Sequence, residues 1–222
     1  MPAIRVENLG KQFANGHWAL QDVSFEIPRG AVVRLLGRNG AGKSVLLKIL
    51  SRVLRPTTGS AEIRGSLAPL LEVGTGFHPE LTGLENIYLN GVLLGMRRAD
   101  VARRLDEIIA FSGVEPFLDQ PIKHFSSGMF MRLAFAVAVH LDRDIFFLDE
   151  VLAVGDADFR AQCLTRVRSL AAEGRTIVFV SHGEEFEPLS TSALLLEKGR
   201  LIAAGDPRTV RRQFYKQSEP SL

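Results

Sequence analysis

One glycine-rich segment constrains the fold of this chain more than any other: Gly37-Arg38-Asn39-Gly40-Ala41-Gly42-Lys43-Ser44. It follows an apolar run at residues 31–36 and precedes a second apolar run at 45–50. This order predicts a strand, a tight loop and a helix. The pattern G-x-x-x-x-G-K-[ST] in that setting predicts a phosphate-binding loop, and therefore a nucleotide site.

The residues of this loop suit a polyphosphate. Glycines let backbone N–H groups approach an anion with no Cβ in the way, and the N-terminus of the following helix adds positive charge. Lys43 would neutralise the β- and γ-phosphates, and the hydroxyl of Ser44 would bind Mg²⁺. An incidental glycine-rich turn, the alternative, does not account for the flanking strand and helix. The predicted nucleotide-binding residues are Gly37, Arg38, Asn39, Gly40, Ala41, Gly42, Lys43, Ser44 and Val45.

Composition limits the other functions that are open to the chain. Its 222 residues, 46% of them hydrophobic, suffice for one domain with a subdomain, so residues 1–222 are predicted to form a single domain. The 27 basic and 25 acidic residues nearly balance, which gives no reason to expect a nucleic-acid partner. We recognise no signal peptide and no segment long enough to cross a bilayer. Cys163, the one cysteine, is assigned a packing role.

The patterning predicts an α/β fold with a mostly parallel core sheet. Two antiparallel strands near the start predict an N-terminal antiparallel β subdomain. A helical block at about 77–141 interrupts the strand–helix alternation and is predicted to be an inserted helical subdomain. The expected strands are 3–13, 20–28, 31–36, 60–65, 145–148 and 175–180, with a hairpin at 193–205 and, within 67–77, an apolar strand that runs into a glycine-rich loop. The expected helices are one that starts near Lys43 and includes 45–50, then 84–94, 99–111, 128–141, 158–173 and a short basic one after 207.

Polar residues at the carboxyl ends of two predicted strands are the candidate catalytic residues. Asp149 and Glu150 follow the apolar run at 145–148, and His182 follows the strand at 175–180. The carboxyl edge of a parallel sheet is where α/β proteins bind ligands, and packing does not explain two adjacent carboxylates. His182, taken alone, has a structural role as its alternative.

Three further positions have two interpretations each. Phe13 could stack on an adenine ring or pack in the core. Glu72, between an apolar strand and a glycine-rich loop, could face Mg²⁺ and phosphate or be a solvated strand end. Ser126, at the start of a predicted helix, could belong to a second anion site or serve only as a helix cap.

The order of these segments resembles the ATP-binding subunit of ABC transporters, and the match runs from about residue 3 to 207. The phosphate loop, Phe125-Ser126-Ser127-Gly128-Met129, the strand to Asp149-Glu150 and His182 stand in the order of that family. Residues 70–88 resemble the exporters of O-antigen, teichoic acid and capsular polysaccharides. So does Ser126-Ser127-Gly128-Met129, where most relatives carry Ser-Gly-Gly-Gln.

The resemblance implies a role for each residue of the phosphate loop's surroundings. Phe13 would stack on adenine, and Lys43 would contact the phosphates. Asp149 would support Mg²⁺ together with Ser44. Glu72 would take the place usually held by a glutamine that senses Mg²⁺ and the attacking water.

The resemblance also implies the residues that act on the γ-phosphate. Glu150 would act on the attacking water, and His182 would contact the γ-phosphate. Ser126, Ser127 and Gly128 would bind the γ-phosphate of ATP held by the opposite subunit. Asp156 would lie in the loop at 153–156 that crosses the dimer interface.

The function implied is an ATPase that uses ATP and Mg²⁺ to power export of a cell-surface glycan. It would act as a homodimer with ATP sandwiched between subunits, peripheral to the cytoplasmic face of the inner membrane, and an integral membrane permease would contact the glycan. The helical subdomain is the candidate docking surface for that permease. A carbohydrate-binding domain after residue 207, which some such exporters have, is not recognisable.

The sequence leaves three alternatives to a polysaccharide-export ATPase. The first is the ATPase of a drug or lipid exporter. The second is a soluble ABC ATPase acting on ribosomes or DNA, and the third is a nucleotide-dependent binding module without turnover. The basic residues at 208–216 are interpreted as a solvated face, with membrane lipid or a partner as the alternative.

Overall fold

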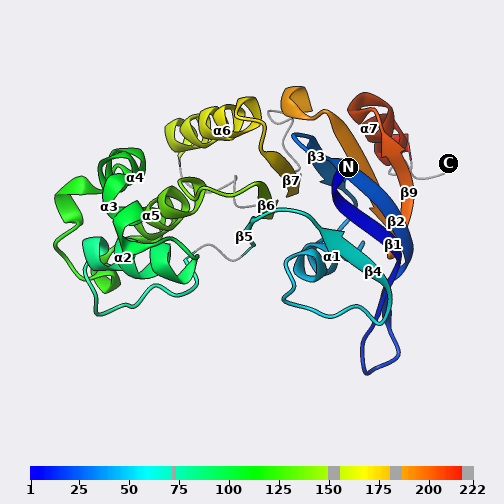
Figure 1. Cartoon of the computed structure of the whole chain (residues 1–222), viewed down its shortest axis with the longest axis horizontal. Coiled ribbons are helices and arrows are strands. Elements are labelled where there is room, and N and C mark those ends of the chain that lie inside the picture. The colour runs from blue at the N-terminus through cyan, green and yellow to red at the C-terminus, as the bar shows by residue number, and fades with distance from the viewer. Residues whose placement is uncertain (72–73, 150–155, 181–186, 217–222) are drawn as a thin grey trace. The chain divides into compact units, whose positions relative to one another are not determined.

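The computed structural model describes residues 1–71, 74–149, 156–180 and 187–216 (Figure 1). The chain divides into two compact units. The first comprises residues 1–71, 143–150 and 168–222, and the second comprises 72–142 and 151–167.

The described residues of the first unit form two sheets, two complete α-helices, the end of α6 (Ala157–Ala172) and a short 3₁₀ turn at Glu187–Leu189. A three-stranded antiparallel sheet has the order β2-β1-β4, and a six-stranded sheet has the order β5-β6-β7-β3-β8-β9. In the second sheet β5, β6, β7, β3 and β8 are parallel, and β9 pairs antiparallel with β8. The elements are β1 (Pro2–Gln12), β2 (Trp18–Pro28), β3 (Val32–Leu36), α1 (Lys43–Leu50), β4 (Thr58–Ile63), β5 (Leu67–Leu70), β6 (Ile145–Asp149), β7 (Thr176–Val180), β8 (Ser192–Glu197), β9 (Arg200–Gly205) and α7 (Pro207–Lys216).

The parallel strands are mostly apolar because both faces of their sheet are covered. On β8, Leu194 and Leu196 belong to a large apolar cluster that includes the buried side chains of α1. Ala193 and Leu195, which point to the opposite face, pack with Val210 of α7. Since successive side chains of a strand alternate between faces, burial on both sides removes the polar positions that a half-exposed strand would show.

The beginnings of β5 and β6 are joined by a compact hydrogen-bond cluster. The Asp144 carboxylate accepts hydrogen bonds from the backbone N–H and the hydroxyl of Ser66, each at 2.7 Å. The Asp144 N–H in turn donates to the Ser66 hydroxyl at 3.0 Å. The hydrogen bonds from the Ser66 backbone and side chain hold the pKa of Asp144 below its ordinary value of 3.8.

This cluster predicts a specific acid sensitivity. A depressed folded-state pKa adds stability that is present above the unfolded pKa and is lost as the pH falls through the folded pKa. The parent protein should therefore lose part of its unfolding free energy as the pH falls below about 4. Ser66→Ala should flatten that part of the stability–pH profile in urea titrations. A profile that is the same in both proteins would contradict the assignment.

The second unit is helical. Its elements are α2 (Gly83–Leu93), α3 (Arg98–Arg103), α4 (Leu105–Ser112), two short 3₁₀ turns at Glu115–Phe117 and Ile122–His124, α5 (Ser127–Val139) and most of α6 (Ala157–Ala172). Thr82 caps α2 in a reciprocal arrangement with Glu85, and the rings of Phe111, Phe135 and Phe159 pack edge to face or tilted in the core.

The structure confirms the α/β fold, with its mostly parallel sheet, antiparallel strands and helical segment. The prediction of one helix at 99–111 was wrong, because α3 and α4 are separated at Arg104, where φ is −104° and ψ is 5°. The sequence has no glycine or proline at that break, so nothing in it marks the end of a helix. Among the described residues, no helix is long and apolar enough to cross a membrane.

Candidate nucleotide-binding site

The phosphate loop connects the end of β3 to the start of α1, and two of its glycines are required by the backbone around them. Gly37 has a φ of 153°, and a Cβ there would lie 2.5 Å from the carbonyl oxygen of Leu196. Gly42 has a φ of 103°, and a Cβ there would lie 2.6 Å from the carbonyl oxygen of Ala19. The loop is therefore held tightly against its neighbours, which fixes its shape before any ligand binds.

Lys43 is held inside this loop. Its side chain belongs to a residue that is only 8% exposed, and its Nζ donates hydrogen bonds to the carbonyl oxygens of Gly37 at 2.7 Å and Arg38 at 3.2 Å. Burying an ammonium group is costly unless it is hydrogen-bonded and faces an anion. The positive charge is thus fixed at the N-terminus of α1.

The start of α1 fits a phosphate group. Among the described residues, α1 has no acidic side chain in its first turn and no side-chain cap on its N-terminus. The first N–H groups of a helix have no partner within the helix, and they carry the positive end of its dipole. A phosphate would supply the missing hydrogen-bond acceptors.

Asp149 ends β6 at the same edge of the sheet. It is half-buried and lies opposite Val180 in the parallel pairing of β6 with β7, which is the strand next to β3. The Asp149 carboxylate and the exposed hydroxyl of Ser44 are oxygen ligands of the kind that Mg²⁺ prefers. The residue types present therefore fit this metal. The other three predicted residues of this group, Glu72, Glu150 and His182, lie outside the described residues.

Phe13 lies in the turn between β1 and β2 and is 41% exposed. This exposure rules out the core-packing alternative. The Lys11 ammonium lies 5.6 Å from the centre of the Phe13 ring, a cation–π contact that the sequence did not point to. Lys11 also donates a hydrogen bond to the carbonyl oxygen of Arg55 at 2.8 Å. The exposed ring of Phe13 and the positive charge of Lys11 therefore lie next to each other in this part of the chain.

In the second unit, Ser126 is the N-cap of α5. Its hydroxyl accepts a hydrogen bond from the Met129 N–H at 3.1 Å, as the capping alternative expected. Ser127 and Gly128 are the first two residues of α5, and a Cβ at Gly128 would meet nothing closer than the Ser126 hydroxyl at 3.8 Å. Within the described part of the chain, no residue therefore fills the space beside Gly128 at this helix end.

Asp156 immediately precedes α6 in the second unit. Its carboxylate accepts a hydrogen bond from the Phe159 N–H at 2.8 Å and lies 3.8 Å from the Arg132 guanidinium. Arg132 belongs to α5, and its guanidinium lies 4.8 Å from the centre of the Phe159 ring. Asp156 thereby connects the start of α6 to α5, the helix that Ser126 caps.

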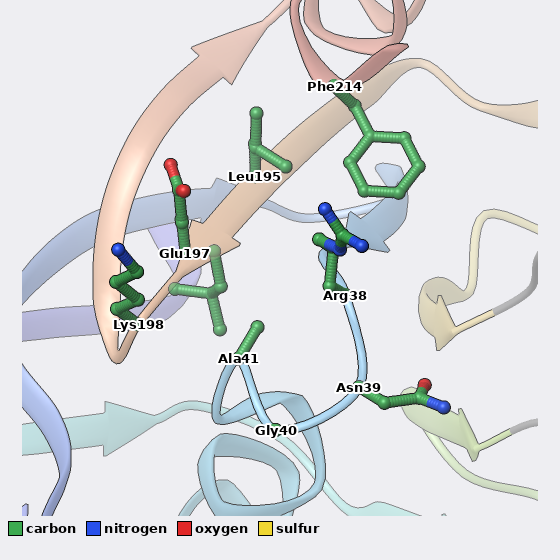
Figure 2. A pocket seen from close by; sticks show the side chains of 9 residues that line it. Arg38, Asn39, Gly40, Ala41, Leu195, Glu197, Lys198 and Phe214 are labelled. Carbon is green, nitrogen blue, oxygen red and sulfur yellow. The ribbon is translucent and has the colours of Figure 1, made fainter. Parts of the chain in front are cut away.

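A cavity of about 390 Å³ lies against the phosphate loop on its β8 side (Figure 2). Figure 2 shows the Arg38 guanidinium pointing toward the Phe214 ring, with Glu197 and Lys198 on the opposite wall and Asn39 directed away from both. Because β8 and β6 lie on opposite sides of β3, this cavity is on the side of the loop that faces away from Asp149.

A phosphate loop between β3 and α1, with an aspartate ending β6 at the same sheet edge, defines a phosphate-loop nucleotide-binding protein. Comparison with known proteins identifies the family. The sequence pattern of the ABC transporter family matches residues 20–153, and the chain belongs to this family as an ATPase domain that binds nucleotide. The resemblance drawn from the loop, Ser126–Gly128 and Asp149 is thereby confirmed.

Several relatives have names that refer to export. The chain is 50% identical to the O-antigen export system ATP-binding protein RfbB of Myxococcus xanthus, over 88% of this chain and 45% of that protein. It is 45% identical to RfbB of Klebsiella pneumoniae over 90% of this chain and 81% of that protein. It is 39% identical to the teichoic acids export ATP-binding protein TagH of Bacillus anthracis over 87% and 35% respectively. The chain thus spans less than half of two of these relatives.

Solved structures show the same fold. The structure of an ATP-binding subunit of an ABC transporter, 27% identical, superposes with a TM-score of 0.84 over 98% of this chain and 95% of that one. A dimeric ATP-binding cassette bound to ADP and inorganic phosphate, 22% identical, has a TM-score of 0.79 over 92% of this chain and 99% of that one. At 22% identity, the comparison with this second structure shows a shared fold and nothing more.

Proposed function

We propose that the chain is the ATP-binding and ATP-hydrolysing subunit of an ABC transporter that exports a cell-surface polysaccharide. The observation that carries this proposal is the 45% identity to the Klebsiella O-antigen export protein over most of both chains. The phosphate loop, the buried Lys43 and the position of Asp149 supply the matching chemistry. The glycan would be of the O-antigen, capsule or teichoic-acid type.

Each described residue has a role in this proposal. The loop from Gly37 and the N–H groups at the start of α1 bind the phosphates, and Lys43 neutralises charge on the β- and γ-phosphates. Ser44 and Asp149 would hold Mg²⁺, which when bound draws charge from the phosphate oxygens. Phe13 stacks on the adenine ring.

Residues outside the described part of the chain complete the proposed set. Glu72 would sense Mg²⁺ and the water, Glu150 would activate the water, and His182 would contact the γ-phosphate. Phosphoryl transfer needs charge neutralised on several oxygens and a water in line, which is largely a matter of positioning. These three assignments rest on the order of the motifs along the chain.

The proposed active form is a homodimer with two split sites. Ser126, Ser127 and Gly128 at the start of α5 would bind the γ-phosphate of ATP on the opposite subunit, and the loop with Asp156 would cross the interface. An isologous dimer gives each nucleotide the same two sides. ATP would join the subunits and hydrolysis would release them, so its binding energy could move attached membrane subunits.

The proposed function also implies a domain organisation and a cellular location for the chain. The chain would be a single nucleotide-binding domain with a helical subdomain at about 77–141. It would lie at the cytoplasmic face of the inner membrane, bound to an integral membrane permease. The permease would contact most of the transported glycan, and no nucleic acid would take part.

A chromosomal Lys43→Ala replacement in the native host tests the export function. We expect surface polysaccharide to disappear and its lipid-linked precursor to accumulate inside the cell. Lys48→Ala, on the same helix but away from the loop, is the control and should leave the surface unchanged. Normal surface polysaccharide in the Lys43 variant would contradict the proposal, and a changed lipid or drug resistance instead would favour a drug or lipid exporter.

Substitution of Ser126 can distinguish a role as the cap of α5 from a role in ATP hydrolysis. Ser126→Asp keeps an N-cap oxygen for the Met129 N–H, so the thermal midpoint should change little. The added carboxylate would face the γ-phosphate of the partner's ATP, so the ATPase rate should fall about a hundredfold. Ser126→Ala should instead cost about 1 kcal/mol of stability. A fully active Ser126→Asp protein would show that this serine is a cap only.

A further inference from the structure

Helix α7 carries a row of positive side chains on its outer face. Arg208, Arg212 and Lys216 are all exposed and are spaced four residues apart, which places them on one face of the helix. Like charges at this spacing repel one another. An anion lying across the three side chains would remove that repulsion.

These side chains line a hollow of about 330 Å³. Its walls are Glu187, Arg208, Arg211, Arg212, Tyr215 and Lys216. The Arg211 guanidinium lies 5.4 Å from the centre of the Tyr215 ring. In the part of the chain that the structure describes, four cations and one carboxylate therefore border a single concave surface.

Glu187 supplies the one carboxylate among the described residues of the hollow, and two guanidinium groups share it. Glu187 Oε2 is ion-paired with Arg211, and it lies 3.7 Å from the Arg34 Nη1. The Arg34 side chain is only 4% exposed, so its positive charge adds to the potential of the hollow with little screening by water. Among the described residues that line the hollow, four positive side chains stand against the one carboxylate of Glu187.

The apolar side of α7 is used for packing. Val210 is 2% exposed and packs with Leu36, Ala193 and Leu195, and Phe214 packs against the same cluster. Among the described residues of α7, Tyr215, which is 48% exposed, is the one large apolar side chain left at the surface, and this is less apolar surface than a membrane-surface helix requires. The concave shape and the charge favour a small anion over a lipid surface.

We propose that this hollow is a second anion site of the chain, separate from the phosphate loop, and that it binds the phosphate groups of a small soluble phosphorylated molecule. Arg208, Arg212 and Lys216 would donate charge-assisted hydrogen bonds to the phosphate oxygens. Tyr215 would lie beside the part of the ligand to which the phosphate groups are attached. The Arg211–Glu187–Arg34 cluster forms the inner wall and stays intact when the site fills.

The test is a calorimetric titration of the full chain with inorganic pyrophosphate. The parent protein should show two sites. Arg212→Ser/Lys216→Ser should weaken one of them about tenfold or more, since two charge-assisted contacts are lost. Lys43→Met should weaken the other. Arg160→Ser/Arg168→Ser, which removes two exposed arginines of α6, is the control and should change neither site.

Each outcome of this titration has one meaning. If the Arg212/Lys216 variant keeps both sites at parent affinity, or if the α6 control loses affinity equally, the proposal is wrong. If only the Lys43 variant is unchanged, the phosphate loop assignment fails and the second site stands. Sedimentation with phosphatidylglycerol vesicles that depends on Arg212 and Lys216, without pyrophosphate binding, would replace the soluble ligand by a lipid surface.

Discussion

Lys43→Ala should lower the ATPase rate of the purified protein at least about a hundredfold, because a preorganised charge on the phosphates is worth that much or more. The Lys43 ammonium is buried and held by the carbonyl oxygens of Gly37 and Arg38, so it faces the phosphates without first losing a hydration shell. Steady-state phosphate release at saturating ATP measures the effect.

Two variants control for damage to the loop itself. Lys43→Met keeps much of the buried volume and removes the charge, so it should be as inactive as Lys43→Ala while remaining folded. Lys48→Ala, which changes a lysine in the last turn of α1, should keep parent activity. Parent activity in either Lys43 variant would remove this lysine from the proposed site.

Glu187→Gln should destabilise the protein by about 3 kcal/mol, the largest stability change that we expect from one charge. The variant removes a carboxylate that is ion-paired with Arg211 and lies 3.7 Å from the buried Arg34 guanidinium, so the attraction between these charges in a low-dielectric setting is lost. Urea denaturation of the parent and the variant measures the difference in unfolding free energy.

Two further proteins test the cause of this loss. Arg34→Leu/Glu187→Gln should recover most of the stability, because an apolar side chain on that face of β3 would pack beside Leu36 and Val210. Glu26→Gln removes an exposed pair, in which Arg5 and Glu26 are 40% and 53% exposed, and should cost less than about 0.5 kcal/mol. Equal losses from Glu187→Gln and Glu26→Gln would show that burial is not the cause.

The sequence predicted the parts of the fold that local patterns determine. The phosphate loop has fixed spacing and needs glycines at Gly37 and Gly42, and the structure shows why in the carbonyl oxygens that lie beside them. The fully apolar run at 145–148 indicated a strand that is covered on both faces, as the structure shows. The hairpin of β8 and β9 followed from the turn at Lys198-Gly199, where both residues have positive φ.

The sequence did not predict features that depend on distant pairings. Arg34 lies inside the apolar run at 31–36, yet it is buried, and its guanidinium lies 3.7 Å from the carboxylate of Glu187, which comes from a distant segment. The contact of Lys11 with the Phe13 ring could not be predicted, because it depends on the conformation of the turn between β1 and β2. The hydrogen bonds between Ser66 and Asp144 could not be predicted either, because they depend on the register in which β5 pairs with β6.

The central claim is that each ATP is hydrolysed between two copies of the chain, with Lys43 from one copy and Ser126 from the other. Mixing Lys43→Ala protein with Ser126→Asp protein tests this directly, since each is expected to be inactive alone. Random pairing makes about half of the dimers mixed, and each mixed dimer has one intact site of two, so about a quarter of the parent rate should return. If the mixture stays as inactive as its two components, although the mixed dimers form, the split site is wrong.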